Sequence, residues 1–335
     1  MWKYVDIGEG QKIFHKIDDC IFSKKTKYQL LEIIKTKEFG NVLFLDGDPQ
    51  SSEVEEYIFN ECLVHPAMIT QQKPKTVFIG GGGTGLTLRE VLRYNSIERV
   101  DIVDIDKEVV DICKKFFNYA AESFSDPRTR LYHDDARQFL SETSSKYDCI
   151  FLDTTMPHHE DIAAPLYRKE FFEIANQKLN PGGVFATAAN SADFRYSTRF
   201  ASVVKTLQQV FAFVKPYTTY TPLFGQEWAF VFASNTVDPT KLKPHQVNEK
   251  LAEKGCNELN FYDGLTHQRI FSIDKKMRKI LKEGGTILTD SNQAHDEIFV
   301  PEISESNLFE NYVNMMDLSQ RSSLIEFVKA HHKTF

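Results

Sequence analysis

The chain has 335 residues, and its 40 Lys and Arg against 47 Asp and Glu give a formal net charge of -7. This length suits one large or two modest domains, and the negative charge argues against binding to a phosphate backbone. Because the N-terminus lacks a signal-peptide core and no apolar run is long enough to span a membrane, we expect a cytoplasmic protein without a nucleic-acid or membrane partner. The five cysteines are scattered without a C-x-x-C motif, which indicates reduced thiols rather than disulfides or a zinc site.

Short β-type runs separated by turns fill the first 70 residues. Tyr28–Thr36 and Asn41–Leu45, followed by a turn at Asp46–Pro49, predict a small antiparallel β domain over residues 1–70. Glu55–Ile69 then has a helical pattern.

From Thr76 to about Ser234, apolar runs alternate with helical stretches, which predicts a doubly wound, mostly parallel seven-stranded sheet. The expected strands are Thr76–Ile79, Arg99–Val103, Thr129–His133, Cys149–Asp153, Val184–Ala188 and an antiparallel edge formed by Phe213–Tyr220 and Trp228–Ala233. Asn190–Gln209 is expected to form a helix. We assign residues 71–285 to this domain and residues 286–335 to a C-terminal extension that could end in an amphipathic helix.

The segment Thr76–Asp106 is the most informative part of the chain. A β-type run enters four glycines, Gly80–Gly83, and a helical stretch and a second run ending in Asp104 follow. Such a glycine turn lets the backbone approach a ligand, and an acid about 20 residues later can accept both hydroxyls of a ribose. The order G-G-G-G-T-G differs from the G-x-G-x-x-G that holds a pyrophosphate. It looks more like the G-x-G-T-G of adenosylmethionine-dependent transferases.

Several polar positions follow the ends of the expected strands. In an open α/β sheet the ligand lies outside the carboxyl ends of the strands, so Gly81–Gly85, Asp104, Asp135 and Asp153 are expected on one rim. An acid at a strand end can also simply cap the next turn, so each position alone has a structural interpretation.

The order of several motifs resembles the polyamine aminopropyltransferases, which are the spermidine, spermine and thermospermine synthases. The matching segments are Tyr28–Met68, the R-E-V-L after the glycines, the V-D-I-D that ends the second run, Tyr132–Leu140, Tyr147–Pro157, Leu179–Thr187 and, more weakly, Leu259–Leu281. The resemblance implies a Rossmann-like adenosylmethionine-dependent transferase fold behind an N-terminal β domain. It also implies a homodimer or homotetramer, a small amine acceptor and no metal.

The resemblance also implies roles for individual residues. Asp153 would be the general base, since an ammonium has no lone pair and must lose a proton before it can displace a thioether from a sulfonium carbon. The residues expected to bind the donor nucleoside and its arm are Gln29, Gly81, Gly83, Thr84, Gly85, Asp104, Ile105, Asp135 and Ala136. The residues expected around the acceptor are Gln50, Phe59, Asn60, Thr154, His158, Phe224 and Trp228.

The chain departs from the family pattern where the substrates would bind. The second acid of the D-x-x-D-P motif is replaced by Met156, and the Tyr-Gln or Tyr-His pair is Phe59-Asn60. The acid that grips the aminopropyl arm of decarboxylated adenosylmethionine is replaced by Thr84, whose neutral hydroxyl tolerates the carboxylate of intact adenosylmethionine. His158 and His159 lie in the loop that follows, and no third ligand has the spacing of a zinc site.

Three functions therefore remain open at this point. The first is an aminopropyltransferase that uses decarboxylated adenosylmethionine and releases methylthioadenosine. The second is a transferase that uses intact adenosylmethionine to move a methyl or a 3-amino-3-carboxypropyl group to a small amine. The third is a non-enzymatic nucleoside-binding relative, and the retained Asp153, Asp104, Asp135 and glycines argue against it.

Overall fold

The computed structural model describes residues 2–8, 11–155 and 162–291. Met156, His158 and the expected C-terminal amphipathic helix lie outside these residues. Within them, no helix combines the length and the apolar character that crossing a membrane requires.

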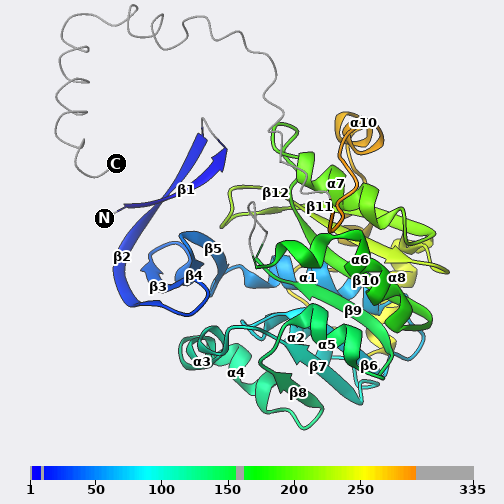
Figure 1. The fold of residues 1–335 in the computed structure, drawn as a ribbon, viewed down its shortest axis with the longest axis horizontal. Coiled ribbons are helices and arrows are strands. Elements are labelled where there is room, and N and C mark those ends of the chain that lie inside the picture. Colours follow the sequence, from blue (N-terminus) through cyan, green and yellow to red (C-terminus); the bar gives the residue numbers. More distant parts are fainter. Residues whose placement is uncertain (1, 9–10, 156–161, 292–335) are drawn as a thin grey trace, which may run out of the picture. The chain divides into compact units, whose positions relative to one another are not determined.

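The N-terminal region folds into a five-stranded antiparallel sheet whose strands follow one another in chain order (Figure 1). Its strands are β1 (Trp2–Gly8), β2 (Gln11–Lys25), β3 (Leu30–Thr36), β4 (Gly40–Leu45) and β5 (Asp48–Ser52). The sequence predicted β3 and β4 but not the β1–β2 hairpin. Most side chains of β2 are exposed on both faces, so they lack the alternation that marks a half-buried strand.

The second sheet has seven strands in the order β11-β12-β10-β9-β6-β7-β8. Its strands are β6 (Thr76–Gly81), β7 (Arg99–Val103), β8 (Thr129–Tyr132), β9 (Tyr147–Asp153), β10 (Leu179–Ser191), β11 (Phe213–Thr221) and β12 (Gln226–Ser234). Neighbours are parallel from β10 to β8, and β12 pairs antiparallel with both β10 and β11. The predicted fold class is confirmed, including its antiparallel edge.

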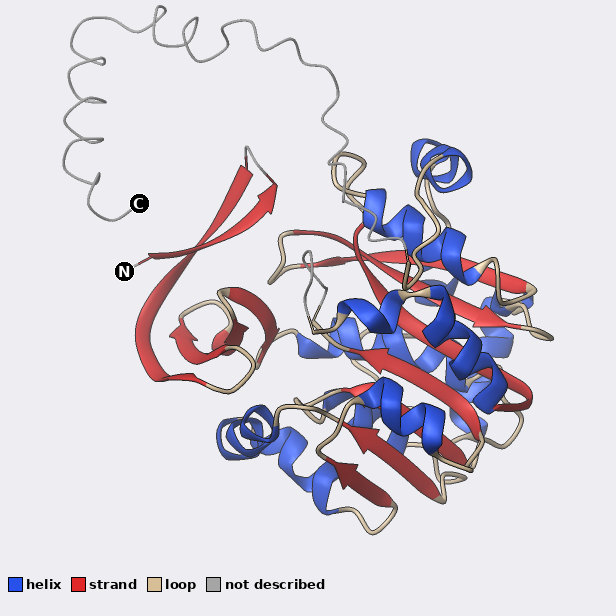
Figure 2. Cartoon of the chain, in the orientation of Figure 1, coloured by secondary structure: helices blue, strands red, loops and turns tan. Residues whose placement is uncertain are grey.

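Helices cover both faces of this sheet (Figure 2). They are α1 (Glu56–Met68), α2 (Leu86–Leu92), α3 (Lys107–Phe116), α4 (Asn118–Ser125), α5 (Ala136–Glu142), α6 (Lys169–Lys178), α7 (Thr198–Leu207), α8 (Pro244–Glu253), α9 (Gly264–Ile270) and α10 (Lys275–Glu283), with short 3-10 turns η1 (Ala164–Tyr167) and η2 (Pro239–Lys241). The helix expected over Asn190–Gln209 is present as α7 but starts only at Thr198, because β10 continues to Ser191. The predicted start of this helix was wrong.

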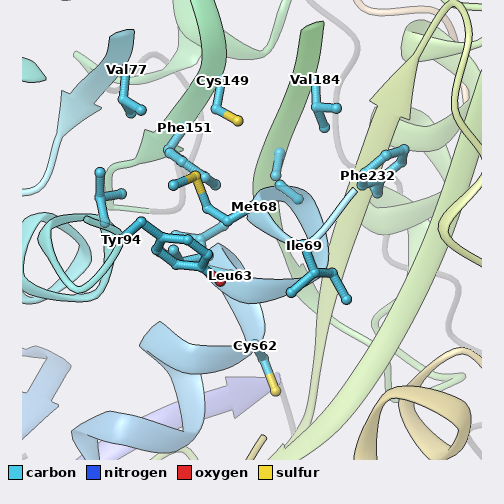
Figure 3. Packing of buried hydrophobic residues seen from close by; sticks show 14 of the residues in the cluster. Cys62, Leu63, Met68, Ile69, Val77, Tyr94, Cys149, Phe151, Val184 and Phe232 are labelled. Carbon is cyan, nitrogen blue, oxygen red and sulfur yellow. The ribbon is translucent and has the colours of Figure 1, made fainter. Parts of the chain in front are cut away.

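Two apolar cores fill the space between the sheet and its helices. Alternate residues of each strand face opposite cores: Val77 and Ile79 of β6 join one core, and Phe78 joins the other. The first core surrounds α1, whose Leu63 and Met68 pack beside Phe151 and Phe232 (Figure 3). Although α1 lies within residues 1–70, it is part of the core of the larger sheet.

Ion pairs fix α1 against α2. Arg89 donates to both carboxylate oxygens of Glu56, at 2.8 and 2.7 Å, and to Glu90 at 2.8 Å. Glu90 also lies 3.2 Å from Nε2 of the buried His65. Because a bidentate guanidinium–carboxylate pair sets both distance and orientation, it holds the start of α1 beside the first turns of α2.

The five-stranded sheet packs against the larger domain with both of its faces. Leu31 and Ile33 contact Val109 and Cys113 of α3. Val42 and Phe44 belong to a cluster that includes the turn between β11 and β12. These contacts fix residues of the β2–β3 loop next to the carboxyl end of β7.

Candidate active site

The site is built where the strand order of the larger sheet reverses, between β6 and β9. Gly81 pairs with Asp153 across the two strands, and the amide of Gly82 donates to the carbonyl of Asp153 at 2.7 Å. A Cβ atom at Gly81 would lie 2.2 Å from that carbonyl oxygen, and Gly81 has a φ of +80°. Only glycine allows this approach.

The end of β7 supplies the second carboxylate of the site. A Cβ atom at Gly83 would lie 2.7 Å from Oδ2 of Asp104, so the glycine turn is pressed against this side chain too. Burial raises the pKa of Asp104 to about 6, and the negative charge of Asp106 adds to the shift. Backbone hydrogen bonds from Asp106 and Gly83 oppose it. The Asp104 carboxyl is therefore partly protonated near pH 6 in the free protein.

Asp153 ends β9 and is half-buried. Burial raises the pKa of its carboxyl, and a hydrogen bond from Thr87 opposes this effect. That bond runs from Oγ1 of Thr87 to Oδ2 of Asp153 at 2.7 Å. Asp104 and Asp153 also repel each other, because the charge on Asp153 contributes to the raised pKa of Asp104. Two neighbouring desolvated carboxylates create a site that favours a cation.

Gln29, expected to join Asp104 at the ribose, donates instead to Oδ2 of Asp106 at 3.1 Å. Thr26 donates to the same oxygen at 2.7 Å, and the other oxygen of Asp106 caps the N-terminus of α3. Asp106 is thus a buried tie between the β2–β3 loop and the larger domain. Ile105 lies between the two acids and is partly exposed.

Asp135 lies just beyond β8, as expected, and its carboxylate has a structural contact. Its Oδ1 accepts hydrogen bonds from the amides of Arg137 and Gln138 at 2.7 and 2.9 Å, which makes it the N-cap of α5. The side chain is exposed, and the following Ala136 is buried. The Oδ2 atom is therefore available at the rim.

The aromatic residues expected around the acceptor come together. Phe59 of α1 meets the ring of Phe224 edge-on at 6.4 Å, and Phe224 lies 4.5 Å from Trp228. The indole Nε1 of Trp228 is buried without a hydrogen-bond partner among the described residues. A buried donor without a partner is costly, so this atom is a candidate contact for a ligand.

The other residues expected at the acceptor have contacts with the scaffold. Thr154 shares a 3.3 Å hydrogen bond with the buried hydroxyl of Tyr167, and the side-chain amide of Gln50 donates to the carbonyl of Asp48 at 3.1 Å. Oδ1 of Asn60 accepts from Thr87 at 3.2 Å. His158 lies outside the described residues.

Three residues of this region had no signal in the sequence. Thr87 looks like an ordinary helical residue, and Tyr167 lies far along the chain in η1. Glu55 is 5% exposed, accepts from Ser52 at 3.2 Å through Oε1, and has no hydrogen-bond partner for Oε2 within the described ranges. Burial raises its pKa to about 7. A buried carboxylate of this kind could have been found only from the structure.

The part of the chain that the structure describes holds no group of three or more His, Cys, Asp or Glu side chains that could bind a metal ion.

A doubly wound sheet with a glycine turn and strand-end acids at its switch point defines a nucleoside-binding enzyme class. A family model described as spermine/spermidine synthase domain matches residues 56–243, and one described as spermidine synthase tetramerisation domain matches residues 1–53. The chain belongs to the spermine/spermidine synthase family, and the predicted family and transferase class are confirmed.

Named relatives agree with this family. The polyamine aminopropyltransferase of Sulfurisphaera tokodaii is 37% identical over 279 residues, which cover 83% of this chain and 92% of the relative. Polyamine aminopropyltransferase 2 of Hyperthermus butylicus is 36% identical over 298 residues, covering 88% and 97%.

Two solved structures are similar along most of their length. The spermidine synthase of Thermotoga maritima has a TM-score of 0.77 and 26% identity, with 84% of this chain and 94% of that chain covered. A spermidine synthase in complex with the transition state analogue AdoDATO has a TM-score of 0.78 and 26% identity, with coverages of 84% and 95%.

The close approach at Gly81 leads to a first prediction. Gly81→Ala should lower the free energy of unfolding by about 3 kcal/mol or more, because a methyl group would collide with the Asp153 backbone in addition to the cost of a positive φ. Gly182→Ala is the matched control, since Gly182 has a φ of +82° but its added Cβ would have Thr236 Oγ1, 4.0 Å away, as its nearest contact. Urea unfolding of both variants measures the difference. Equal destabilisation would show that the approach to Asp153 costs nothing.

Proposed function

We propose that this protein transfers an aminopropyl group from decarboxylated S-adenosylmethionine to a small polyamine-type amine and releases methylthioadenosine. The observation that carries the proposal is Asp153, a half-buried carboxylate at the switch point, beside the half-buried carboxylate of Asp104. The family match, and the transition state analogue bound by a similar spermidine synthase, support the choice of reaction.

The proposed chemistry follows from the charges of the site. Asp104 would accept the ribose hydroxyls, with Ile105 beside it, and Asp135 would accept the exocyclic amine of adenine next to Ala136. Gly81–Gly85 would let the sulfonium approach the backbone. Asp153 would take the proton of the acceptor ammonium, so that the amine lone pair attacks the carbon next to sulfur. The sulfonium leaves as a neutral thioether, and no metal is needed for that step.

The acceptor is expected to be an elongated cationic amine. Phe59, Phe224 and Trp228 form apolar and cation–π surfaces for its methylene chain and ammonium groups. Glu55 is a buried side chain close to those rings. The backbone of Leu223, which precedes Phe224, lies near enough to lower the pKa of Glu55. Gln50, Asn60, Thr154 and His158 remain predicted acceptor residues.

The donor arm gives one specific reason for a second candidate function. Thr84 places a neutral, partly exposed hydroxyl where the family pattern has an acid. Intact adenosylmethionine would therefore meet less repulsion than a carboxylate at position 84 would cause. Transfer of a methyl or 3-amino-3-carboxypropyl group to an amine is the alternative that this residue favours.

We also propose a homo-oligomer, either a dimer or a tetramer, and the tetramerisation-domain match over residues 1–53 supports it. The division of the chain into residues 1–70, 71–285 and 286–335 stays a prediction.

The titration of Asp104 predicts a pH-dependent affinity for methylthioadenosine. The charged carboxylate accepts the ribose hydroxyls, so affinity should be constant above about pH 7 and should fall towards tenfold per pH unit below the free-protein pKa of about 6. Calorimetry between pH 5 and 8 measures this. Asp104→Asn should bind at least tenfold more weakly at pH 7.5 and lose the dependence, whereas the exposed control Asp111→Asn should retain it. A pH-independent parent protein would remove Asp104 from the ribose site.

The role of position 84 can be tested by charge alone. Thr84→Asp should weaken binding of intact adenosylmethionine about 10- to 100-fold relative to the decarboxylated donor, because two carboxylates would face each other in a partly desolvated cleft. The Asn side chain of Thr84→Asn has nearly the same shape as the Asp side chain of Thr84→Asp but carries no charge, so this variant should leave the ratio of the two affinities unchanged. Product analysis with each donor then identifies the group transferred. A ratio that does not respond to Thr84→Asp would show that residue 84 does not contact the donor arm.

Asp153→Asn should reduce turnover at least 100-fold while leaving methylthioadenosine affinity within about threefold of the parent. Asn keeps the size of the side chain but cannot accept the proton. Asp111→Asn, on the exposed surface of α3, is the control for a general loss of one charge. A variant that binds normally and retains more than about a tenth of the parent rate would exclude Asp153 as the base.

A further inference from the structure

The single hydroxyl of Thr87 lies within hydrogen-bonding distance of two acceptor oxygens. It lies in the first turn of α2 and has no exposed surface. Its Oγ1 is 2.7 Å from Oδ2 of Asp153 and 3.2 Å from Oδ1 of Asn60. Because a hydroxyl carries a single hydrogen, it can donate fully to only one of these oxygens at a time.

The second acceptor is fixed in place. The Nδ2 atom of Asn60 donates to the backbone carbonyl of Glu56 at 2.7 Å, so Oδ1 is turned towards Thr87. Asn60 is 4% exposed. The bidentate pair between Arg89 and Glu56 holds the two helices that carry Asn60 and Thr87, so the geometry of this pair of acceptors is preorganised.

The charge of Asp153 determines which acceptor receives the hydroxyl hydrogen of Thr87. A carboxylate is a stronger acceptor than an amide oxygen, and the shorter distance to Asp153 agrees with a charged side chain. Once Asp153 is protonated, its oxygens are weaker acceptors, and the hydroxyl hydrogen is better placed on Asn60. Only a rotation about the Cβ–Oγ1 bond of Thr87 separates the two arrangements.

Other titratable groups face Asp153 without offering this alternative. Asp104, directly after β7, interacts with it through charge repulsion. Tyr167, from η1, also senses the charge of Asp153, but burial raises its pKa to about 12 and its hydroxyl bonds to Thr154. Within the described ranges, Thr87 is the side chain that hydrogen-bonds the Asp153 carboxylate.

We propose that Thr87 is a positioning residue whose hydroxyl hydrogen turns from Asp153 to Asn60 when Asp153 takes the proton of the acceptor amine. This inference rests on the proposed function. In the step, an N–H bond of the ammonium breaks and the proton binds Asp153. The freed lone pair forms the new C–N bond, and the C–S bond breaks with its electrons on sulfur. Thr87 and Asn60 exchange no proton with the substrate, so they adjust the strength of the base without entering the atom balance.

Two substitutions should move the acid limb of the pH–rate profile in opposite directions. Thr87→Val removes the donor that stabilises charged Asp153, so the limb should move up by about one pH unit. Asn60→Leu removes the competing acceptor and leaves Thr87 to serve the charged form, so the limb should move down, by about half a unit. Thr87→Ser keeps the hydroxyl and should restore the parent profile.

The double variant gives the sharpest test. Without the Thr87 hydroxyl, no hydrogen bond connects Asn60 to Asp153. The pH–rate profile of the double variant Thr87→Val, Asn60→Leu should therefore match that of Thr87→Val alone. The measurement is kcat/KM from pH 5.5 to 9 with the donor that supports turnover. The proposal would be overturned if the acid limbs of the two single variants shift in the same direction or do not shift. It would also be overturned if the two shifts add in the double variant.

A second readout separates this inference from the proposed function. The carboxyl carbon of Asp153 can be titrated by NMR in the full chain labelled at aspartate, with its signal assigned as the one absent from Asp153→Asn. The same opposite shifts are expected there even without turnover. If the parent protein transfers no group from either donor, the proposed function fails. If Thr87→Val and Asn60→Leu leave the NMR titration of Asp153 unchanged, the proposed turn of the Thr87 hydroxyl from Asp153 to Asn60 is wrong. Methylthioadenosine affinity at pH 7.5, close to that of the parent, verifies folding of each variant.

Discussion

The contact between the glycine turn and the backbone of Asp153 is the constraint on which the site depends. Without side chains at Gly81 and Gly82, the ends of β6 and β9 close up, and Gly83 comes to lie against Asp104. The carboxylates of Asp104 and Asp153, which are 49 positions apart in the sequence, then share one poorly hydrated rim. This close approach, which would admit the sulfonium of the proposed donor, also makes both acids costly to charge when no ligand is bound.

In the proposed reaction, that cost would give the substrates a role in preparing the base. A bound sulfonium would bring a positive charge next to Asp104 and Asp153, which favours their charged forms. An arriving ammonium would then meet a carboxylate stabilised by the donor's charge and by the Thr87 hydroxyl. As the C–S bond breaks, the sulfonium charge would disappear, and protonated Asp153 would become the favoured state. The electrostatics of the rim would thus change in step with the reaction.

The sequence was sufficient for the parts of the molecule that have a strong local pattern. The apolar runs of the second sheet were each predicted at the position of a strand, and Arg99–Val103 matches β7 at both ends, whereas β10 extends beyond both ends of the predicted Val184–Ala188. The β1–β2 hairpin was missed because its side chains are mostly exposed. The bond from Gln29 to Asp106, and the position of Thr87 between Asp153 and Asn60, depend on how distant elements pack, which no local spacing encodes.

The three consecutive residues Phe59, Asn60 and Glu61 show how packing divides one motif into separate tasks. Successive helical residues point about 100° apart, so each meets a different neighbour. Glu61 accepts three backbone hydrogen bonds from residues 260–262 and has no exposed surface, which makes it an anchor for the segment after β12. Asn60 faces Thr87, and Phe59 packs against the ring of Phe224. The retained glutamate therefore reflects the fold, whereas phenylalanine in place of the family's tyrosine at position 59 would alter the polarity of the proposed acceptor side without disturbing that anchor.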